Sequence, residues 1–347
     1  NDAYNPERTI SLFGKGIPLV VTDTPTETQV SHIVLADTLW SCPQIEVRSS
    51  VQVSPQARLT IRPYKDAVSV LADSTCGFNV SGELHARRSL NQLYSVSFAG
   101  VDSLASWKGF VFESNLTGES RLDSLTIINT NDYSRFEEGG GAIHSNDYHN
   151  ILLSNVDIKN SHSQHQGGAI YLNNGMVQLS ECSIMSGTAL KGGAISAIGS
   201  GSNLSINGST FSSNQAQQSG GFLFAEDASI SVNASQIVEN SAAEGGAISV
   251  VGSEAELSMY ETTFSGNAAQ DIGGAVYLDS ANASLMESTF IGNQSIYGGA
   301  LAIVGDQSNV AISQGVFNDN GDSPETADYT CNGGSIYQAG GQLTIHD

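Results

Sequence analysis

The stretch FSSNQAQQSGGFL, from Phe211 to Leu223, contains the two motifs that decide the fold. The second motif is a double glycine followed by two small or apolar residues, and its eight copies begin at Gly140, Gly167, Gly192, Gly220, Gly245, Gly273, Gly298 and Gly333. Successive copies start 27, 25, 28, 25, 28, 25 and 35 residues apart. A period of this size, with no helical pattern inside it, predicts a solenoid built from one repeated unit.

The first motif is a phenylalanine followed three residues later by an asparagine, and its copies begin at Phe211, Phe264, Phe290 and Phe317. Ile237 opens a degenerate copy of the same series. We expect the phenylalanines to stack in the interior and the asparagines to form a ladder of amide hydrogen bonds at one corner. The expected ladder contains Asn214, Asn240, Asn267, Asn293 and Asn320.

Apolar residues alternate with small or polar ones in the stretch that precedes each phenylalanine–asparagine motif. The positions seven and five residues before each phenylalanine or isoleucine are apolar in every copy from Val177 to Ile312. The position between them holds Gln178, Ser205, Ser231, Ser258, Ser284 and Ala311. This period of two is that of β-strands with one face inward. The sequence therefore predicts an all-β, right-handed, single-stranded parallel β-helix of about 25–28 residues per coil, with about three short strands and three corners in each coil.

Three regions of the chain differ in regularity. Residues 136–347 carry the regular coils, and residues 31–135 contain strand-like runs without either motif, which predicts irregular opening coils. Residues 1–30, which include Pro6, Pro18 and Pro25, are expected to form an extended arm or cap, because a solenoid needs atypical terminal units. The last residues read as a strand, and we expect further polypeptide or another subunit to cover it.

Charge excludes several classes of partner. The 347 residues include 13 Lys and Arg against 35 Asp and Glu, which gives a net charge of -22. Such a chain repels nucleic acid and anionic membranes, and no apolar run is long enough to insert directly into a bilayer. After Lys191 there are 16 acidic residues and no Lys or Arg, which argues against an enzyme that cleaves acidic polysaccharides. We expect an extracellular or cell-surface protein without a cofactor.

The fifth residue of each double-glycine unit is predicted to face outward, and this position holds His144, Tyr171, Ser196, Phe224, Ser249, Tyr277, Ala302 and Tyr337. Aromatic rings would then recur on alternate coils, about 9.6 Å apart. Tyr171, Phe224, Tyr277 and Tyr337 are therefore a candidate face for stacking on sugar rings or packing on a protein. The alternative is that a loop, a terminal segment or a neighbouring subunit covers these rings.

The paired GGA(I/L/V) and FxxN motifs resemble those of the polymorphic outer membrane proteins of chlamydiae and of related surface proteins in other bacteria and microbial eukaryotes. The resemblance covers Gly139 to Asp347. It implies a surface-exposed β-helical passenger, a class that often serves in adhesion.

Three functions are compatible with these observations. The first is a non-enzymatic structural stalk or adhesin, whose partner is a protein or glycan on a host or neighbouring cell. The second is a subunit that assembles with copies of itself into a fibre, through its ends or its N-terminal arm. The third is a carbohydrate-active β-helix enzyme. No metal site is expected, because the glycine- and aspartate-rich nonapeptide of calcium-binding β-rolls is missing.

Cysteines and sequons complete the candidate residues. Cys182 occupies a position that is small in other coils and Cys331 lies several coils away from it, so Cys42 and Cys76 form the candidate disulfide. Seven N-x-S/T sequons occur, at Asn79, Asn115, Asn203, Asn207, Asn233, Asn282 and Asn293. In a eukaryotic source we expect N-linked glycans there.

Overall fold

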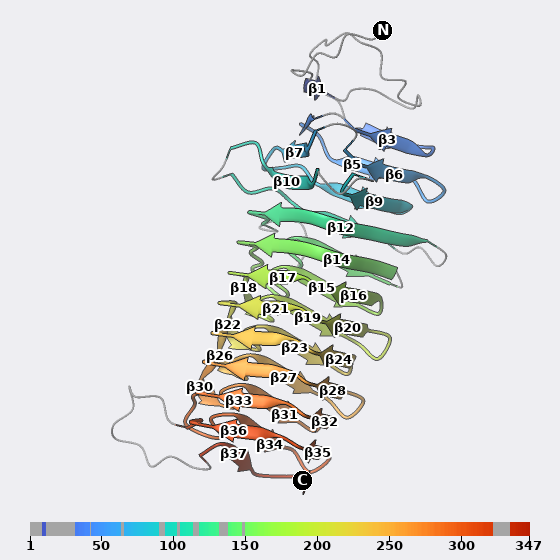
Figure 1. The fold of residues 1–347 in the computed structure, drawn as a ribbon. Helices are drawn as coiled ribbons and strands as arrows, with labels where there is room; N and C mark the ends of the chain where they lie inside the picture. Colours follow the sequence, from blue (N-terminus) through green and yellow to red (C-terminus); the bar gives the residue numbers. More distant parts are fainter. Residues whose placement is uncertain are drawn as a thin grey trace.

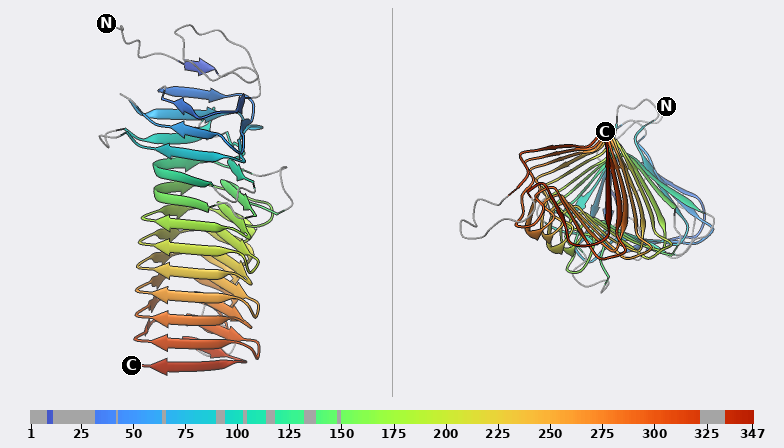
Figure 2. Two further views of the ribbon diagram at one scale, coloured as in Figure 1. Left: turned by 90° about the vertical axis from the view of Figure 1, so that its right-hand side faces the viewer. Right: turned by 90° about the horizontal axis from the view of Figure 1, so that it is seen from below.

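A computed structural model of the chain describes residues 9–11, 32–41, 43–63, 66–89, 94–102, 105–113, 118–131, 138–147, 150–321 and 334–347. Every regular element in these ranges is a β-strand, and the paired strands run parallel (Figure 1). Successive coils stack along one axis as a β-solenoid (Figure 2). The predicted all-β parallel β-helix is confirmed.

One sheet has 12 strands, one from each coil, and the double glycines precede its regular strands. We call it the double-glycine sheet. Its strands are β2 (His32–Val34), β5 (Val51–Val53), β8 (Phe78–Val80), β11 (Phe110–Phe112), β13 (Ile143–Asn146), β15 (Ile170–Asn173), β19 (Ile195–Ile198), β23 (Leu223–Glu226), β27 (Ile248–Val251), β31 (Val276–Asp279), β34 (Leu301–Val304) and β37 (Ile336–Gln338).

A second sheet has 22 strands and consists of two half-sheets that meet at a bend. The first half-sheet contains β3 (Thr38–Trp40), β6 (Arg58–Ile61), β9 (Glu83–Arg87), β12 (Glu119–Ile128), β14 (Asn150–Lys159), β16 (Met176–Ser180), β20 (Asn203–Asn207), β24 (Ser229–Asn233), β28 (Glu256–Tyr260), β32 (Asn282–Met286), β35 (Asn309–Ser313) and β38 (Gln342–His346). The second half-sheet shares β12 and β14 and adds β1 (Thr9–Ser11), β4 (Gln44–Val47), β7 (Val68–Ala72), β10 (Val96–Gly100), β17 (Ser183–Met185), β21 (Thr210–Ser212), β25 (Gln236–Val238), β29 (Thr263–Ser265), β33 (Thr289–Ile291) and β36 (Val316–Asn318).

A small third sheet runs along the regular coils and contains β18 (Thr188–Lys191), β22 (Gln215–Ser219), β26 (Ser241–Glu244) and β30 (Ala268–Ile272). A coil such as Ile170–Lys191 therefore has four strands, β15 to β18. The expectation of about three strands and three corners is wrong for these coils, because the run before each asparagine motif bends and because a short strand follows it.

Left-handed backbone conformations mark the corners, four times in each regular coil. At the bend between the half-sheets they fall on Ser124, Asn155, Glu181, Gly208, Ala234, Glu261, Glu287 and Gln314. In the coil that begins at Gly167, the other three are Gly167, Asn174 and Ser186. A left-handed residue turns the chain within one position, so the strands between corners stay short.

The two glycines of each pair have different roles. Gly167 has a φ of 60°, and an added Cβ would lie 2.1 Å from the backbone oxygen of Ile170. At Gly168, an added Cβ would lie 2.1 Å from the backbone oxygen of Gly193 in the next coil. The first glycine thus permits a tight turn, and the second permits close contact between backbones of neighbouring coils.

The core lies between the sheets. The positions seven and five residues before the phenylalanine or isoleucine of each motif are buried from Val177 to Ile312, as the alternation predicted. The ring centroids of Phe264 and Phe290 lie 4.9 Å apart, and those of Phe290 and Phe317 lie 4.8 Å apart, with nearly parallel planes. Stacked rings at the spacing of the coils therefore fill one side of the interior, as expected.

The opening coils vary in length. Leu59 pairs with Leu84, which is 25 residues later, whereas Ala86 pairs with Leu122, which is 36 residues later. Of the expected N-terminal arm, only Thr9–Ser11 lies within the described residues, where it pairs with β4. Larger aromatic side chains fill the interior here, and Phe78, Phe98, Trp107 and Phe110 contact one another.

Candidate binding surface

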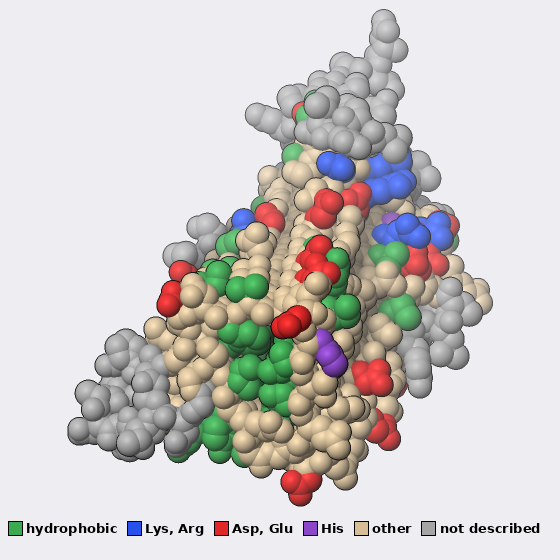
Figure 3. All heavy atoms as spheres, turned by 60° about the horizontal axis from the view of Figure 1, so that its bottom comes forward, with side chains coloured by type: hydrophobic (Ala, Val, Ile, Leu, Met, Phe, Trp, Pro, Cys, Tyr) green, Lys and Arg blue, Asp and Glu red, His purple; other side chains and the backbone are tan. Residues whose placement is uncertain are grey.

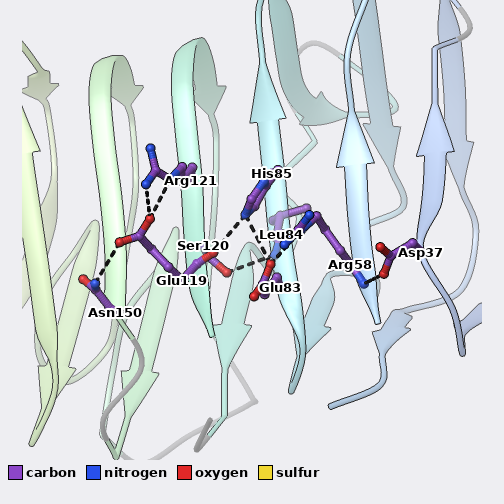
Figure 4. Close-up of polar contacts among 9 residues, drawn as sticks. All are labelled: Asp37, Arg58, Glu83, Leu84, His85, Glu119, Ser120, Arg121 and Asn150. Atoms are coloured by element: carbon purple, nitrogen blue, oxygen red, sulfur yellow. Dashed lines mark hydrogen bonds and ion pairs between the residues drawn. The ribbon is translucent and has the colours of Figure 1, made fainter. Parts of the chain in front are cut away.

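The outer face of the first half-sheet carries charged side chains on the opening coils (Figure 4). The strands β6, β9 and β12 pair in register, and apolar residues such as Leu59, Leu84 and Leu122 point inward between the outward positions. We call the outward set the charged lattice; it consists of Arg58, Glu83, His85, Glu119 and Arg121. Three neighbouring coils therefore present their ionisable groups to solvent on one flat surface.

Arg58 connects two coils through opposite charges. Its Nε donates to Oε2 of Glu83 at 2.6 Å, and its backbone nitrogen donates to Oδ1 of Asp37 at 3.0 Å. The hydrogen bond with Glu83 raises the pKa of the Arg58 guanidinium above its ordinary value.

His85 lies between these groups and the next coil. Its Nε2 lies 2.9 Å from the backbone oxygen of Glu119 and 3.5 Å from Oε2 of Glu83. Burial lowers the pKa of His85 below its ordinary value of 6.5, although the contact with Glu119 opposes this. The imidazole is therefore neutral at neutral pH and serves as a hydrogen-bonding group.

Glu119 is the centre of the lattice on β12. Nε of Arg121 donates to its Oε1 at 2.6 Å, and Nδ2 of Asn150 on β14 donates to its Oε2 at 3.1 Å. The neighbouring hydroxyl of Ser120 is buried and accepts a hydrogen bond from the backbone nitrogen of Leu84 at 3.0 Å. Both carboxylate oxygens of Glu119 therefore accept hydrogen bonds from other side chains of the protein.

Sequence reasoning located the basic residues in this part of the chain but missed the lattice. The missing information was the register, because the coil lengths change from 25 to 36 residues across β6, β9 and β12. The alternation in RLTIRP, from Arg58 to Pro63, was the available signal for an outward row of arginine.

The predicted aromatic face differs from the expectation. Tyr171 is only 4% exposed and Phe224 only 3% exposed, so these two rings do not offer a surface to solvent. Tyr277 and Tyr337 are half-buried. An exposed row of four rings is therefore wrong for this chain, although all four residues do lie on neighbouring or alternate strands of the double-glycine sheet, as predicted.

The cover over these rings comes from the same chain. The Tyr171 ring stacks on His144, with 5.2 Å between the ring centroids. Over Phe224 and Tyr337, the covering residue directly precedes a double glycine and reaches the ring of the following coil. Nζ of Lys191 lies 4.4 Å from the centroid of the Phe224 ring, and the rings of Tyr297 and Tyr337 lie 5.2 Å apart. Oγ of Ser196 donates to Oε1 of Gln166 in the same way. Among the alternatives considered, an intramolecular cover is the one observed.

Burial also changes the chemistry of the tyrosines. It raises the pKa of Tyr277 to about 12, with Asp279 and Glu244 adding to the effect. Burial likewise raises the pKa of Tyr171 to about 12, helped by Glu138 and Glu226. Both phenols are therefore neutral across the physiological range.

The five asparagines of the expected ladder bond to one another at one corner. Nδ2 of Asn214 donates to Oδ1 of Asn240, and the same bond joins Asn240 to Asn267, Asn267 to Asn293 and Asn293 to Asn320, at 2.9 to 3.0 Å. The first four side chains are fully buried. Each of these four also donates to the backbone oxygen of the phenylalanine or isoleucine that opens the motif in the preceding coil, such as Phe211 for Asn240. The ladder is a structural element, because the amides of its first four members have no access to solvent.

The sequons differ in accessibility. Asn203 and Asn207 are exposed on β20, whereas Asn79, Asn233 and Asn282 are half-buried. Asn293 is fully buried in the ladder, and its Nδ2 donates to Asn320. A glycan on Asn293 is therefore incompatible with the fold, which corrects the expectation for this site. Asn115 lies outside the described residues.

The cysteines and the remaining side chains show no further site. Cys76 and Cys182 are buried thiols, and burial raises the pKa of Cys182 to about 11. Cys42, the expected partner of Cys76, lies outside the described residues, as does Cys331. In the described ranges no group of three His, Cys, Asp or Glu residues is placed to hold a metal ion. The same ranges contain no helix that is both long and apolar enough to span a membrane.

The parallel coils, the asparagine ladder and the paired glycines define a β-solenoid repeat protein. Residues 261–279 match the model of the Chlamydia polymorphic membrane protein repeat. This segment contains FSGN from Phe264 and GGAV from Gly273, so the match falls on the two motifs that decide the fold. The chain is a polymorphic-membrane-protein-like β-helical protein, and the predicted resemblance is confirmed. Comparison with curated proteins gave no match, and comparison with solved structures gave none.

Proposed function

We propose that the chain is a surface-displayed, non-enzymatic β-helix that acts as a stalk and an adhesive surface. The observation that carries the proposal is the unbroken stack of 12 strands in the double-glycine sheet, built from a repeat that matches a family of surface proteins. At about 4.8 Å per coil, the stack is on the order of 50 Å long. Such a stack holds a binding face away from its point of attachment.

A non-enzymatic role is favoured by the state of the acidic residues. In the charged lattice, Glu83 and Glu119 are each paired with an arginine at 2.6 Å, so both carboxylates are occupied by contacts within the chain. After Lys191 the chain has no Lys or Arg that could hold an acidic substrate. These features support binding and support rather than catalysis.

The test has two parts. Protease treatment and antibody staining of intact source cells should reveal the chain at the surface, and beads coated with the chain should adhere to cells or to a glycan or protein array. Absence from the surface together with no adhesion to any of these would contradict the proposal. End-to-end fibres of native material in electron microscopy would instead favour a filament subunit.

A further inference from the structure

We propose that the outer face of the opening coils binds an anionic polysaccharide through the guanidinium groups of Arg62 and Arg87. This inference rests on the proposed adhesive function and names the class of its ligand. The two residues are called the arginine pair below.

Register places the arginine pair side by side. Ile61 of β6 pairs with Ala86 of β9. On the other side of β6, the backbone nitrogen of Arg62 donates to the oxygen of Trp40 at 2.9 Å, so the strand backbone continues through Arg62. The residues that follow Ile61 and Ala86 are Arg62 and Arg87, on neighbouring strands about 4.8 Å apart. Side chains alternate between the two faces of a strand. Because the preceding residues, Ile61 and Ala86, are fully buried in the core, the side chains of Arg62 and Arg87 point outward.

Two like charges directly opposite each other on neighbouring strands repel, and this repulsion disfavours the arrangement unless an anion compensates it. The other arginines on this face are compensated within the chain, Arg58 by Glu83 and Arg121 by Glu119. Within the described part of the chain, neither guanidinium of the arginine pair has a hydrogen bond or ion pair. Asp123 pairs in register with Arg87, but its Oδ1 accepts a hydrogen bond from Ser124.

The surroundings suit a carbohydrate. Thr60 and His85 supply a hydroxyl and a neutral imidazole in the next outward position, and these groups can bond to sugar hydroxyls. Leu39 pairs in register with Thr60 and is 46% exposed, which offers an apolar contact for the carbon face of a sugar ring. Guanidinium groups bind sulfate and carboxylate through paired hydrogen bonds.

The charge of the whole chain favours a sparsely charged ligand over nucleic acid. On the face shown in Figure 3, the Lys and Arg side chains gather toward the opening coils, with acidic side chains beside them, and only scattered acidic side chains lie on the coils nearer the viewer. A net charge of -22 repels a dense polyanion that must contact many phosphates. A glycan with separated anionic groups needs only the arginine pair.

Binding of the full chain to immobilised κ-carrageenan, hyaluronan and dextran tests the inference at low ionic strength. κ-Carrageenan carries one sulfate and hyaluronan one carboxylate per disaccharide, so we expect binding to one or both, which distinguishes sulfate from carboxylate as the anion, and no binding to neutral dextran. The Arg62→Ala/Arg87→Ala variant should lose at least tenfold in affinity. The matched control is Arg48→Ala/Lys159→Ala, which removes the same charge where acidic neighbours pair with it, and it should change affinity less than twofold.

The inference is overturned if the Arg62→Ala/Arg87→Ala variant binds like the wild type, if both double variants lose affinity equally, or if duplex DNA binds as tightly as either glycan. An unchanged far-UV spectrum and thermal midpoint for both variants secure the comparison. Cell adhesion that persists in the Arg62→Ala/Arg87→Ala variant removes the glycan site but leaves the adhesive function in place. If the wild type itself does not adhere to any cell or array, the adhesive function is contradicted.

Discussion

Asn240 and Asn267 are joined by two hydrogen bonds across neighbouring coils. The backbone nitrogen and Nδ2 of Asn240 both donate to Oδ1 of Asn267, each at 3.0 Å. Nδ2 of Asn240 also donates to the backbone oxygen of Phe211 at 3.0 Å, and its own Oδ1 accepts from Asn214. One side chain therefore satisfies buried groups in three coils.

Removing that side chain should destabilise the fold strongly. Asn240→Ala leaves buried partners in both neighbouring coils without a hydrogen bond, so we expect a loss of about 3 kcal/mol in the free energy of unfolding. Urea unfolding of protein made without glycosylation measures this. The matched control is Asn207→Ala at an exposed position, with an expected change below about 0.5 kcal/mol. Equal midpoints for the two variants would show that the ladder adds no stability.

The second glycine of a pair should not tolerate a methyl group. Gly168→Ala places a Cβ 2.1 Å from the oxygen of Gly193 and 2.7 Å from the nitrogen of Thr188, both backbone atoms. Because neither can move without separating the coils, we expect a loss of about 3 kcal/mol or more. Gly321→Ala is the control, since nothing lies within 4 Å of its added Cβ. Thermal unfolding that is alike in both variants would contradict the packing argument.

Phe224 should contribute to stability rather than to ligand binding. It is 3% exposed under Lys191, so Phe224→Ala removes a buried ring, with an expected cost of about 3 kcal/mol. Tyr260→Ala, at a 36% exposed position, provides the comparison and should cost much less. Denaturant unfolding measures both variants. A Phe224→Ala variant of normal stability that loses adhesion would restore the ring to a binding face.

Stability should fall in strongly alkaline solution. The pKa of Tyr171 and of Tyr277 is raised from 10 to about 12 by burial. The unfolded chain therefore releases these protons first as the pH rises, so the contribution of the two phenols to stability is complete below pH 10 and is lost between pH 10 and about pH 12. The Tyr171→Phe/Tyr277→Phe variant should show a shallower fall of the thermal midpoint between pH 9 and pH 12. Parallel curves for variant and wild type would exclude this origin.

Glycan occupancy should follow exposure. When the chain is secreted from a eukaryotic host, peptide mapping should find glycans on Asn203 and Asn207 and none on Asn293, whose amide is buried in the ladder. Treatment with an N-glycosidase should lower the intact mass accordingly. Modification of Asn293, or an unchanged mass, would contradict the prediction.

The sequence predicted the inward positions because strand alternation is a local property. Leu204 and Ile206 lie on either side of Ser205 in the strand, so both point to the inward face, where they are buried. The asparagine ladder was accessible by the same means, since its members share one position in each repeat. Asn293 belongs both to this ladder and to a sequon, and only its burial in the structure rules out a glycan there.

Alternation could not predict the cover over Phe224. It gives the direction in which a ring points, but not whether the chain passes outside it. That depends on the corner before the double glycine, where Lys191 reaches the ring of the following coil. The contacts of Arg58 with Glu83 and of Arg121 with Glu119 depend likewise on coil lengths, which vary in the opening coils.

The contact of Gly168 with the backbone of Gly193 recurs at Gly193, Gly221, Gly246 and Gly274, each against the next pair of glycines at 2.0 to 2.2 Å from the added Cβ. Along this edge the pitch of the solenoid is fixed by main-chain atoms alone. No side chain takes part in these contacts, so side-chain size does not change the spacing between coils along this edge. Surfaces elsewhere on the coils can therefore carry arginine, serine, asparagine or tyrosine without altering the spacing at which those groups are presented.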